Sequence, residues 1–297
     1  MSGLLKYFLL STFLCSVVFA ELPGSPSDVG HPGSKIYSYN FKSELIRCSN
    51  RDVFVFIPQA NIMSETFPVV IYGHGQALKV EHYQSTMEHL AKKGIIAIFP
   101  NYDTGFFDRD WRRMAQDYVG LSDCALKKLS KENKVNPNFE NIIYSGHSKG
   151  AYVAGVAAGL SFREKLSLLP HGVMLFEPAG LDEEANASVD KEVLYNVVYS
   201  DNDKVVSKKI SQDIYNQVPS LKKQFLLVKS YPELEAGHFW PLTKPSAFGG
   251  TGENALHYYS SWKWLVALAL GRDQYLFGNE AIEKGISGIS DEIIRNW

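Results

Sequence analysis

The stretch NIIYSGHSKGA, residues 141–151, decides how the rest of this 297-residue chain is interpreted. Its apolar start predicts a buried strand, and the small residues that follow predict a helix packed closely on a sheet. Gly146 and Gly150 flank Ser148 in the pattern G-x-S-x-G, because a sharp strand-to-helix turn leaves no room for side chains there. The turn places the serine hydroxyl at a helix N-terminus, where developing negative charge is stabilised. The pattern therefore indicates a nucleophilic serine.

Outward from this stretch, short apolar runs alternate with longer helical patterns. Helices are predicted at 111–129, after Ser148, and at 256–270. Most of the short runs are apolar on both faces, as in strands buried between two layers of helices. The alternation predicts an α/β fold, a mostly parallel eight-stranded sheet flanked by helices, with the first two strands forming an antiparallel hairpin at its edge. The strands are expected at 36–40, 52–57, 68–72, 95–99, 141–144, 172–176, 194–199 and 224–228.

Five segments of the chain resemble the α/β-hydrolase superfamily, in particular its compact branch of chlorophyllases, dienelactone hydrolases, platelet-activating-factor acetylhydrolases and cutinase-like polyester hydrolases. The segments are VVIYGHG (69–75), EHLAKKGIIAIFPNYD (88–103), SGHSKGA (145–151), DNDKVV (201–206) and AGHFWP (236–241). The Gly-His-Ser-Lys-Gly run looks most like the chlorophyllase elbow, where a basic residue also follows the serine. The resemblance implies ester hydrolysis through an acyl-enzyme on Ser148, and it does not imply chlorophyll as the substrate.

The predicted strand at 68–72 ends in a second glycine-rich turn, Gly73-His74-Gly75-Gln76. In α/β-hydrolases the loop after this strand supplies one backbone N–H to the oxyanion hole, and the residue after the nucleophile supplies the other. The resemblance therefore implies the N–H groups of Gln76 and Lys149 as oxyanion-hole donors, with His74 orienting the loop. A glycine-containing loop with a structural histidine is the alternative.

A serine needs a positioned imidazole to act as a nucleophile near neutral pH. Three histidines follow Ser148 in the chain, and in this fold the histidine lies on a loop after a strand. His171 precedes its predicted strand, and His257 lies inside the predicted last helix. His238, just beyond the strand at 224–228, is the preferred base, with an ordinary loop histidine as the alternative.

The acid is expected in the loop SDNDKVV (200–206), which follows a predicted strand. A buried carboxylate there would hold the tautomer of the imidazole and stabilise its cation. Asp203 is preferred because it lies just before the next element, whereas Asp201 would cap the strand end. Glu177, after the preceding strand, is a third option, and a solvated acidic loop is the alternative.

Only about 15 residues, 178–192, separate two predicted strands where many lipases insert a helical lid. Their sequence is acidic and polar, unlike an amphipathic cover, and so we expect an open cleft without a large lid. Aromatic side chains at 102–111, and at Phe239 and Trp240, either form walls for a substrate or anchor their loops.

The composition excludes several classes of protein. Lysine and arginine number 30 against 32 aspartate and glutamate, and 45% of the residues are hydrophobic. The near-neutral balance argues against a nucleic-acid binder, and the apolar content argues against a disordered chain. We expect no cofactor and no metal, since His74, His147 and the aspartates at 201 and 203 lack metal-ligand spacing. The expected partner is a small-molecule or lipid-like ester, and the oligomeric state does not follow from the sequence.

The N-terminal residues form a separate segment. Lys6 precedes an apolar run that ends in Val18-Phe19-Ala20. A basic start, a short apolar stretch and small residues before the cut describe a secretory signal peptide, and the run is too short for a membrane anchor. We therefore expect a signal peptide at 1–20, a flexible lead-in at 21–35, a single α/β-hydrolase domain at 36–297, and secretion.

Two further features of the sequence concern covalent modification: a pair of cysteines and a glycosylation sequon. Cys48 and Cys124 either form a disulfide, as an oxidising compartment permits, or stay as buried thiols. The only N-glycosylation sequon begins at Asn186, in a polar segment that is expected at the surface.

Together the motifs favour a secreted serine hydrolase that cleaves carboxylic esters with Ser148, Asp203 and His238 as its triad. An acyltransferase, a thioesterase or a peptidase would use the same three residues. An inactive extracellular binding module is an alternative from another class, but such proteins usually lose the serine or the histidine, which this chain keeps.

Overall fold

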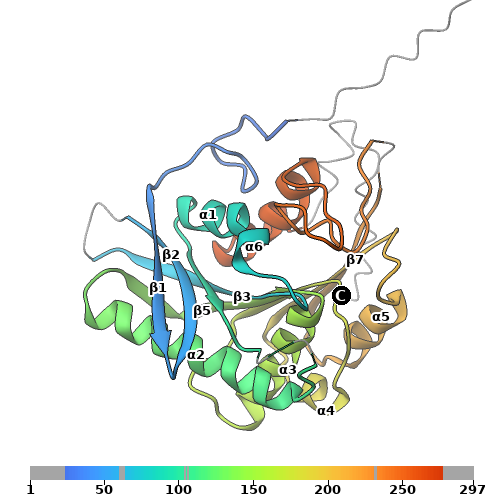
Figure 1. Cartoon of the computed structure of the whole chain (residues 1–297), viewed down its shortest axis with the longest axis horizontal. Helices are drawn as coiled ribbons and strands as arrows, with labels where there is room; N and C mark the ends of the chain where they lie inside the picture. Colours follow the sequence, from blue (N-terminus) through green and yellow to red (C-terminus); the bar gives the residue numbers. More distant parts are fainter. Residues whose placement is uncertain (1–23, 60–63, 104, 106, 231–232, 277–297) are drawn as a thin grey trace, which may run out of the picture.

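The computed structural model describes residues 24–59, 64–103, 105, 107–230 and 233–276 (Figure 1). The expected signal peptide at 1–20 lies outside the described residues, and so does the C-terminal stretch at 277–297. The described part of the chain forms one sheet with helices on both faces, which confirms the predicted α/β architecture.

The sheet has eight strands in the order β1-β2-β4-β3-β5-β6-β7-β8. The strands from β3 to β8 are parallel to one another, whereas β2 runs antiparallel to both of its neighbours, β1 and β4, near one edge. Because the carboxyl ends of parallel strands meet at one edge of a sheet, the loops after them lie together there. The strands are β1 (Phe41–Cys48), β2 (Arg51–Pro58), β3 (Thr66–Gly73), β4 (Ile96–Pro100), β5 (Asn136–His147), β6 (Gly172–Phe176), β7 (Leu194–Ser200) and β8 (Lys222–Val228).

The edge hairpin forms as expected, but the predicted position of its first strand is wrong. The prediction placed it at 36–40, whereas β1 spans Phe41–Cys48. Half of the β1 residues are exposed, so the strand lacks the continuous apolar run that marks the buried strands. Ser49 and Asn50 form the turn to β2 and both have positive φ, as two-residue turns between twisted antiparallel strands require.

Helices cover both faces of the sheet (Figure 1). On one face α2, α3, α4 and α5 contribute to one buried apolar cluster, and on the other α1 and α6 contribute to a second. The helices predicted at 111–129 and after Ser148 are α2 and α3, and the predicted last helix is divided into a π-helical turn, η2, and α6. Their bounds are η1 (Val80–His82), α1 (Gln84–Lys92), α2 (Trp111–Lys131), α3 (Lys149–Arg163), α4 (Glu183–Ala187), α5 (Lys208–Gln217), η2 (His257–Ser261), α6 (Trp262–Ala269) and η3 (Asp273–Tyr275).

Residues 31–34 of the lead-in are buried, so the expectation of a flexible segment at 21–35 is wrong for these four residues, whereas 27–30 and 35 are exposed. His31 is 4% exposed, and its ring meets that of Tyr259 edge-on at 5.9 Å. Gly33 lies so close to η2 that an added Cβ would stand 1.6 Å from the carbonyl oxygen of Tyr258. The glycine that made this segment look flexible is therefore needed for close packing.

Cys48 and Cys124 form a disulfide that joins the end of β1 to α2, with their Cα atoms 6.1 Å apart. The structure thereby decides between the two alternatives that the sequence left open. The bond closes a loop across 76 positions, and it holds the edge hairpin against the helix that covers it.

The expectation that Asn186 lies at the surface is wrong. Asn186 belongs to the short helix α4 and is 3% exposed. Its side-chain amide donates a hydrogen bond to Oε1 of Gln217, 3.1 Å away. The sequence is polar here because α4 exposes its other face, so the folded chain does not present this amide to a glycosyltransferase.

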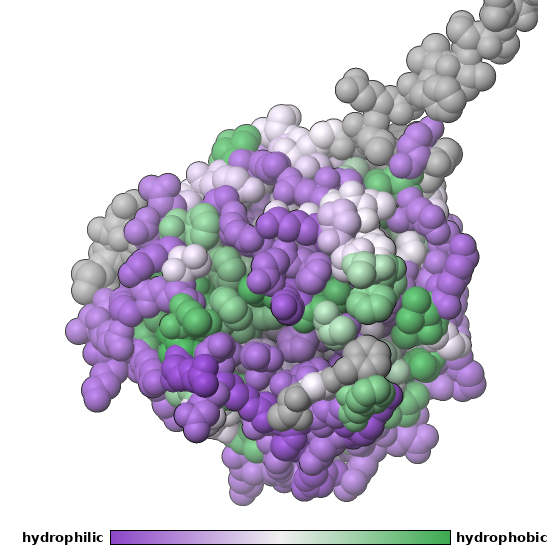
Figure 2. Space-filling view, viewed as in Figure 1, coloured by the Kyte–Doolittle hydropathy of each residue, from purple (hydrophilic) through white to green (hydrophobic). Residues whose placement is uncertain are grey.

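The segment at 178–192 holds only the five-residue helix α4, so no large lid is present among the described residues. None of the helices in this part of the chain combines the length and apolar character that a membrane span needs. The face of the molecule shown in Figure 2 is mostly hydrophilic, with apolar residues gathered in a band across its middle.

We predict that replacing Cys48 and Cys124 together by alanine lowers the free energy of unfolding by about 4 kcal/mol, because the unfolded chain regains the entropy of a long closed loop. Urea unfolding followed by circular dichroism measures the change. Dithiothreitol should destabilise the wild type to the same extent and leave the variant unaffected. Equal urea midpoints for the wild type and the variant would contradict the prediction.

Candidate active site

Ser148 lies in a strained turn where β5 ends and α3 begins. Its φ of 57° and ψ of −120° belong to a region that residues other than glycine rarely occupy. The surrounding backbone holds this conformation, since the Ser148 N–H donates to the carbonyl of Phe176 at 2.9 Å and its carbonyl accepts from the Tyr152 N–H at 3.1 Å. The residue is partly exposed, so the turn presents its hydroxyl at the carboxyl edge of the sheet.

Three glycines make this turn sterically possible. Gly73 at the end of β3 is the register partner of Gly146 at the end of β5. An added Cβ at Gly146 would lie 2.5 Å from the carbonyl of Gly150, and one at Gly150 would lie 2.2 Å from the backbone of Gly73. Because the clashing atoms belong to the backbone, they cannot move aside as a flexible side chain would. These contacts explain why both flanking positions of the motif are glycine.

The structure brings Ser148, His238 and Asp203 into one chain of hydrogen bonds. Nε2 of His238 lies 2.9 Å from Oγ of Ser148, and Nδ1 lies 2.7 Å from Oδ2 of Asp203. Asp203 follows β7 and His238 follows β8, as the sequence predicted. The side chains of the histidine and the aspartate are 2% and 0% exposed. The arrangement fixes the tautomer of His238, with its proton on Nδ1 and Nε2 free to accept the serine proton.

Except for Glu177, the alternative candidates for the base and the acid lie elsewhere in the fold. Asp201 accepts hydrogen bonds from the N–H and the hydroxyl of Ser230, at 2.9 and 2.7 Å, and thereby fixes the loop after β7 to the loop after β8. His171 is exposed before β6. His257 is buried in η2, where its ring packs against Trp262. Of the alternative acids, only Glu177 adjoins the site.

The pKa values of the two neighbouring carboxyl groups at the site, Asp203 and Glu177, are shifted in opposite directions. Burial by itself would raise the pKa of Asp203, but hydrogen bonding with His238 and with Glu177 outweighs it and holds that pKa below the ordinary value. Burial, followed by the neighbouring charge of Asp203, raises the pKa of Glu177 well above the ordinary value. The two carboxyl groups therefore differ in character although they lie side by side.

A second hydrogen-bond chain, which the sequence did not reveal, joins the glycine-rich loop to the histidine loop. The N–H of Gly75 donates to the hydroxyl of Tyr83 at 3.0 Å, and that hydroxyl lies 2.8 Å from Nδ1 of His147. Nε2 of His147 lies 2.8 Å from the carbonyl oxygen of His238 and donates to it. Burial lowers the pKa of His147 to about 3, so the ring stays neutral and keeps this pattern.

Lys149 follows Ser148, and its ammonium group is paired with an acid of another loop. Nζ pairs with Oδ2 of Asp103 at 2.8 Å and lies 5.6 Å from the centre of the Trp111 ring. The Lys149 side chain is 3% exposed, so its charge is used to hold the loop after β4 against α3. Gln76 follows β3 beside the elbow and is partly exposed. The backbone N–H groups of Gln76 and Lys149 remain our predicted oxyanion-hole donors.

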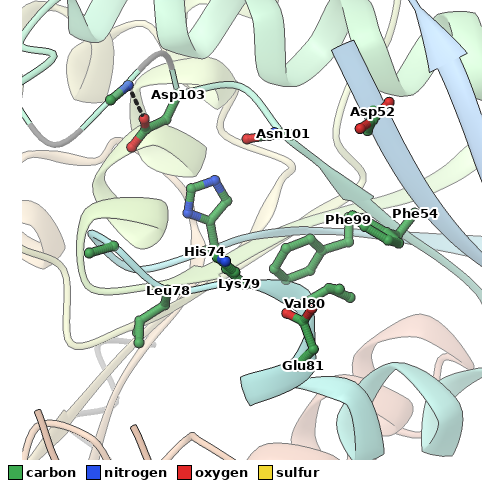
Figure 3. Close-up of a pocket in the computed structure, with 12 residues that line it drawn as sticks. Asp52, Phe54, His74, Leu78, Lys79, Val80, Glu81, Phe99, Asn101 and Asp103 are labelled. Atoms are coloured by element: carbon green, nitrogen blue, oxygen red, sulfur yellow. Dashed lines mark hydrogen bonds between the residues drawn. The ribbon is translucent and has the colours of Figure 1, made fainter. Parts of the chain in front are cut away.

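A cavity of about 370 Å³ adjoins the His74 loop (Figure 3). In Figure 3 the His74 ring lies between Asp103, Asn101 and Phe99. Nδ1 of His74 donates to the Gly75 carbonyl at 3.0 Å, and the ring stacks on Tyr102, so His74 orients its loop from within the cavity wall. The cavity combines apolar and polar walls, as ligand pockets commonly do.

The neighbouring aromatic residues Phe239 and Trp240 have different surroundings. Trp240 is 1% exposed and anchors its loop through a hydrogen bond from Nε1 to Oε1 of Glu177. Phe239 meets the His238 ring edge-on at 4.9 Å and stacks on Phe248, which is 55% exposed. Of the aromatics predicted at 102–111, Tyr102 is buried and stacks on His74, and Phe106 lies outside the described residues.

In the described part of the chain, no three His, Cys, Asp or Glu side chains are grouped as a metal ion would require. Residues 33–179 match the model of a protein family described as Chlorophyllase, a family of the α/β-hydrolase superfamily. The matched residues extend from before β1 to just beyond β6 and contain Ser148, but not Asp203 or His238. No curated protein matches the chain.

We predict that Gly150→Ala destroys the elbow, because the new Cβ would meet the Gly73 backbone at 2.2 Å. The variant should either fail to fold or lose reactivity at Ser148, as circular dichroism and labelling by a fluorophosphonate probe would show. Gly120→Ala is the matched control in α2, where an added Cβ meets nothing within 4 Å and helix propensity should add about 1 kcal/mol of stability. A folded, reactive Gly150→Ala protein would contradict the steric account.

Proposed function

We propose that the chain cleaves carboxylic esters through an acyl-enzyme on Ser148, starting from its match to the Chlorophyllase family model over residues 33–179 and from its mostly parallel α/β sheet. The observation that carries the proposal is the unbroken hydrogen-bond path from Asp203 through His238 to the Ser148 hydroxyl. A path of this kind at a strained elbow supports nucleophilic catalysis, because it provides the base and the orienting acid that a serine lacks by itself.

In the proposed reaction, Nε2 of His238 accepts the Ser148 proton while Oγ attacks the ester carbonyl. The resulting imidazolium is stabilised by Asp203, whose second carboxylate oxygen is held by the N–H groups of Val205 and Val206 at 2.7 and 3.0 Å. The imidazolium then donates its proton to the leaving alcohol. Water, activated in turn by His238, hydrolyses the acyl-enzyme and regenerates the serine.

The oxyanion of the tetrahedral intermediate is proposed to bind the N–H groups of Lys149 and Gln76. Lys149 is the first residue of α3, so its N–H carries the positive end of a 15-residue helix dipole. Each such donor typically contributes about 3 kcal/mol of transition-state stabilisation. The hydrogen-bond chain through Tyr83 and His147 supports this geometry, since it fixes Gly75 relative to the loop of His238.

The surroundings of the site support an ester with an apolar part. Val205 and Phe248 are 61% and 55% exposed, and Val205 lines a depression beside His238. The absence of a large lid over the described residues supports access from solution without activation at a lipid surface.

Secretion is part of the proposal. The N-terminal segment has the pattern of a signal peptide. The disulfide between Cys48 and Cys124 supports export, because such bonds persist in oxidising compartments and are rare in the cytosol.

We predict that the purified wild type hydrolyses a short-chain p-nitrophenyl ester and that Ser148→Ala lowers kcat by a factor on the order of 10⁴ or more, since the attacking oxygen is removed. Release of p-nitrophenolate measures the rate. Undiminished turnover in this variant would end the proposal.

Two aspartates in one loop provide the matched control for the acid. Asp203→Asn should lower kcat by a factor on the order of 10⁴, because its amide stabilises the wrong tautomer of His238. Asp201→Asn should change kcat by less than about 3-fold, since Asp201 contacts Ser230 and not the histidine. The reverse order would show that the acid has been assigned to the wrong residue.

A further inference from the structure

A second carboxyl group lies behind the proposed acid. Glu177 is the first residue after β6, and it is fully buried. Its φ of 50° is unfavourable for a residue other than glycine, and its N–H is held by the carbonyl of Val198 in β7 at 3.0 Å. The backbone is thus constrained so that this side chain points into the interior beside Asp203.

The two carboxyl oxygens of Glu177 differ in their hydrogen bonding. Oε1 accepts a hydrogen bond from the indole Nε1 of Trp240 at 2.9 Å. Oε2 is buried, and no donor among the described residues is in hydrogen-bonding geometry with it. The hydroxyl of Ser200 lies nearby, but it too is buried without such a partner. An ionised carboxylate would leave this oxygen unpaired in a dry interior, which is costly.

The group that does face Glu177 is the carboxyl of Asp203, and the two are hydrogen-bonding neighbours. Two ionised carboxylates repel each other and neither can donate a hydrogen bond, so a bond between them requires a proton on one. Asp203 already receives donors from His238, Val205 and Val206. Glu177 has the indole and, beside it, the Ser200 hydroxyl, whereas Asp203 has three donors, and therefore Asp203 is the better place for the negative charge.

The other charged groups around the pair support this assignment. No lysine or arginine of the described residues forms an ion pair with either carboxyl. Tyr199 of β7 faces both carboxyl groups with its pKa raised by burial, so it is neutral, and His147 is neutral as well. His238 is then the only group here that becomes positively charged during the proposed reaction.

We propose that Glu177 is a positioning residue that keeps its proton and donates it to Asp203, so that Asp203 presents its other oxygen to His238. The inference rests on the proposed function of the triad. The donated hydrogen bond also withdraws negative charge from Asp203 and fixes the orientation of its carboxylate.

Two variants of nearly equal size separate this role from a structural one. Glu177→Met fills the same space without a donor, and we expect kcat to fall about 10-fold or more, KM to change little, and the acid limb of the pH profile to move to higher pH. Glu177→Gln is the conservative variant, because its amide can donate to Asp203 and accept from Trp240. It should restore kcat to within about 5-fold of the wild type and return the acid limb to its original position.

Three kinetic outcomes would overturn the proposal. If the Gln variant loses as much activity as the Met variant, Glu177 acts through a negative charge and not through a proton. If Asp203→Asn remains active while Glu177→Gln does not, Glu177 is itself the acid of the triad. If both variants lower activity without moving the pH profile, Glu177 serves packing alone.

Infrared spectroscopy tests the proton without relying on activity or on the Met variant folding. At neutral pH the wild type should show the carbonyl stretch of a buried, protonated carboxylic acid, and Glu177→Gln should lack it. A wild type with this band but without esterase activity would contradict the proposed function and leave the protonated pair in place. A wild type that cleaves esters but lacks the band would contradict the protonated pair and leave the proposed function in place.

Discussion

The close approach of three glycine backbones, Gly73, Gly146 and Gly150, is the constraint on which the rest of this structure depends. It brings the ends of β3 and β5 and the start of α3 so near one another that no side chain fits between them. The chain can pass this point only if Ser148 adopts a positive φ, and hydrogen bonds from β6 and α3 hold it in that strained state. The strain turns a residue at the end of a buried strand into one whose hydroxyl faces solvent.

Around the elbow, hydrogen bonds join loops that are distant in the sequence into one rigid assembly. One path runs from Asp203 through His238 to Ser148, and a second connects the glycine-rich loop to the carbonyl of His238 through Tyr83 and His147. The second path uses only neutral groups, since burial keeps the His147 ring uncharged. The imidazole is therefore held by its backbone as well as by its ring, which reduces the reorganisation that catalysis requires.

The sequence predicted those features that follow from local chemistry. The elbow glycines, the doubly buried strands and the loops after β7 and β8 each carry a pattern that reports on their own surroundings. The features it missed depend on distant partners: β1 is half exposed and lacks an apolar run, Gly33 packs against η2, and Asn186 turns inward to Gln217. The contact between Tyr83 and His147 has no sequence signal, because 64 positions separate its two members.

The most direct test of the account is to find which atom an electrophile modifies. The wild type would be treated with a fluorophosphonate at neutral pH, digested, and mapped by mass spectrometry. The account predicts a single phosphonyl adduct, carried by Ser148, because among the serines that the structure describes its hydroxyl is the one hydrogen-bonded to a histidine ring. An unmodified protein, or an adduct on any other serine while Ser148 stays free, would contradict it.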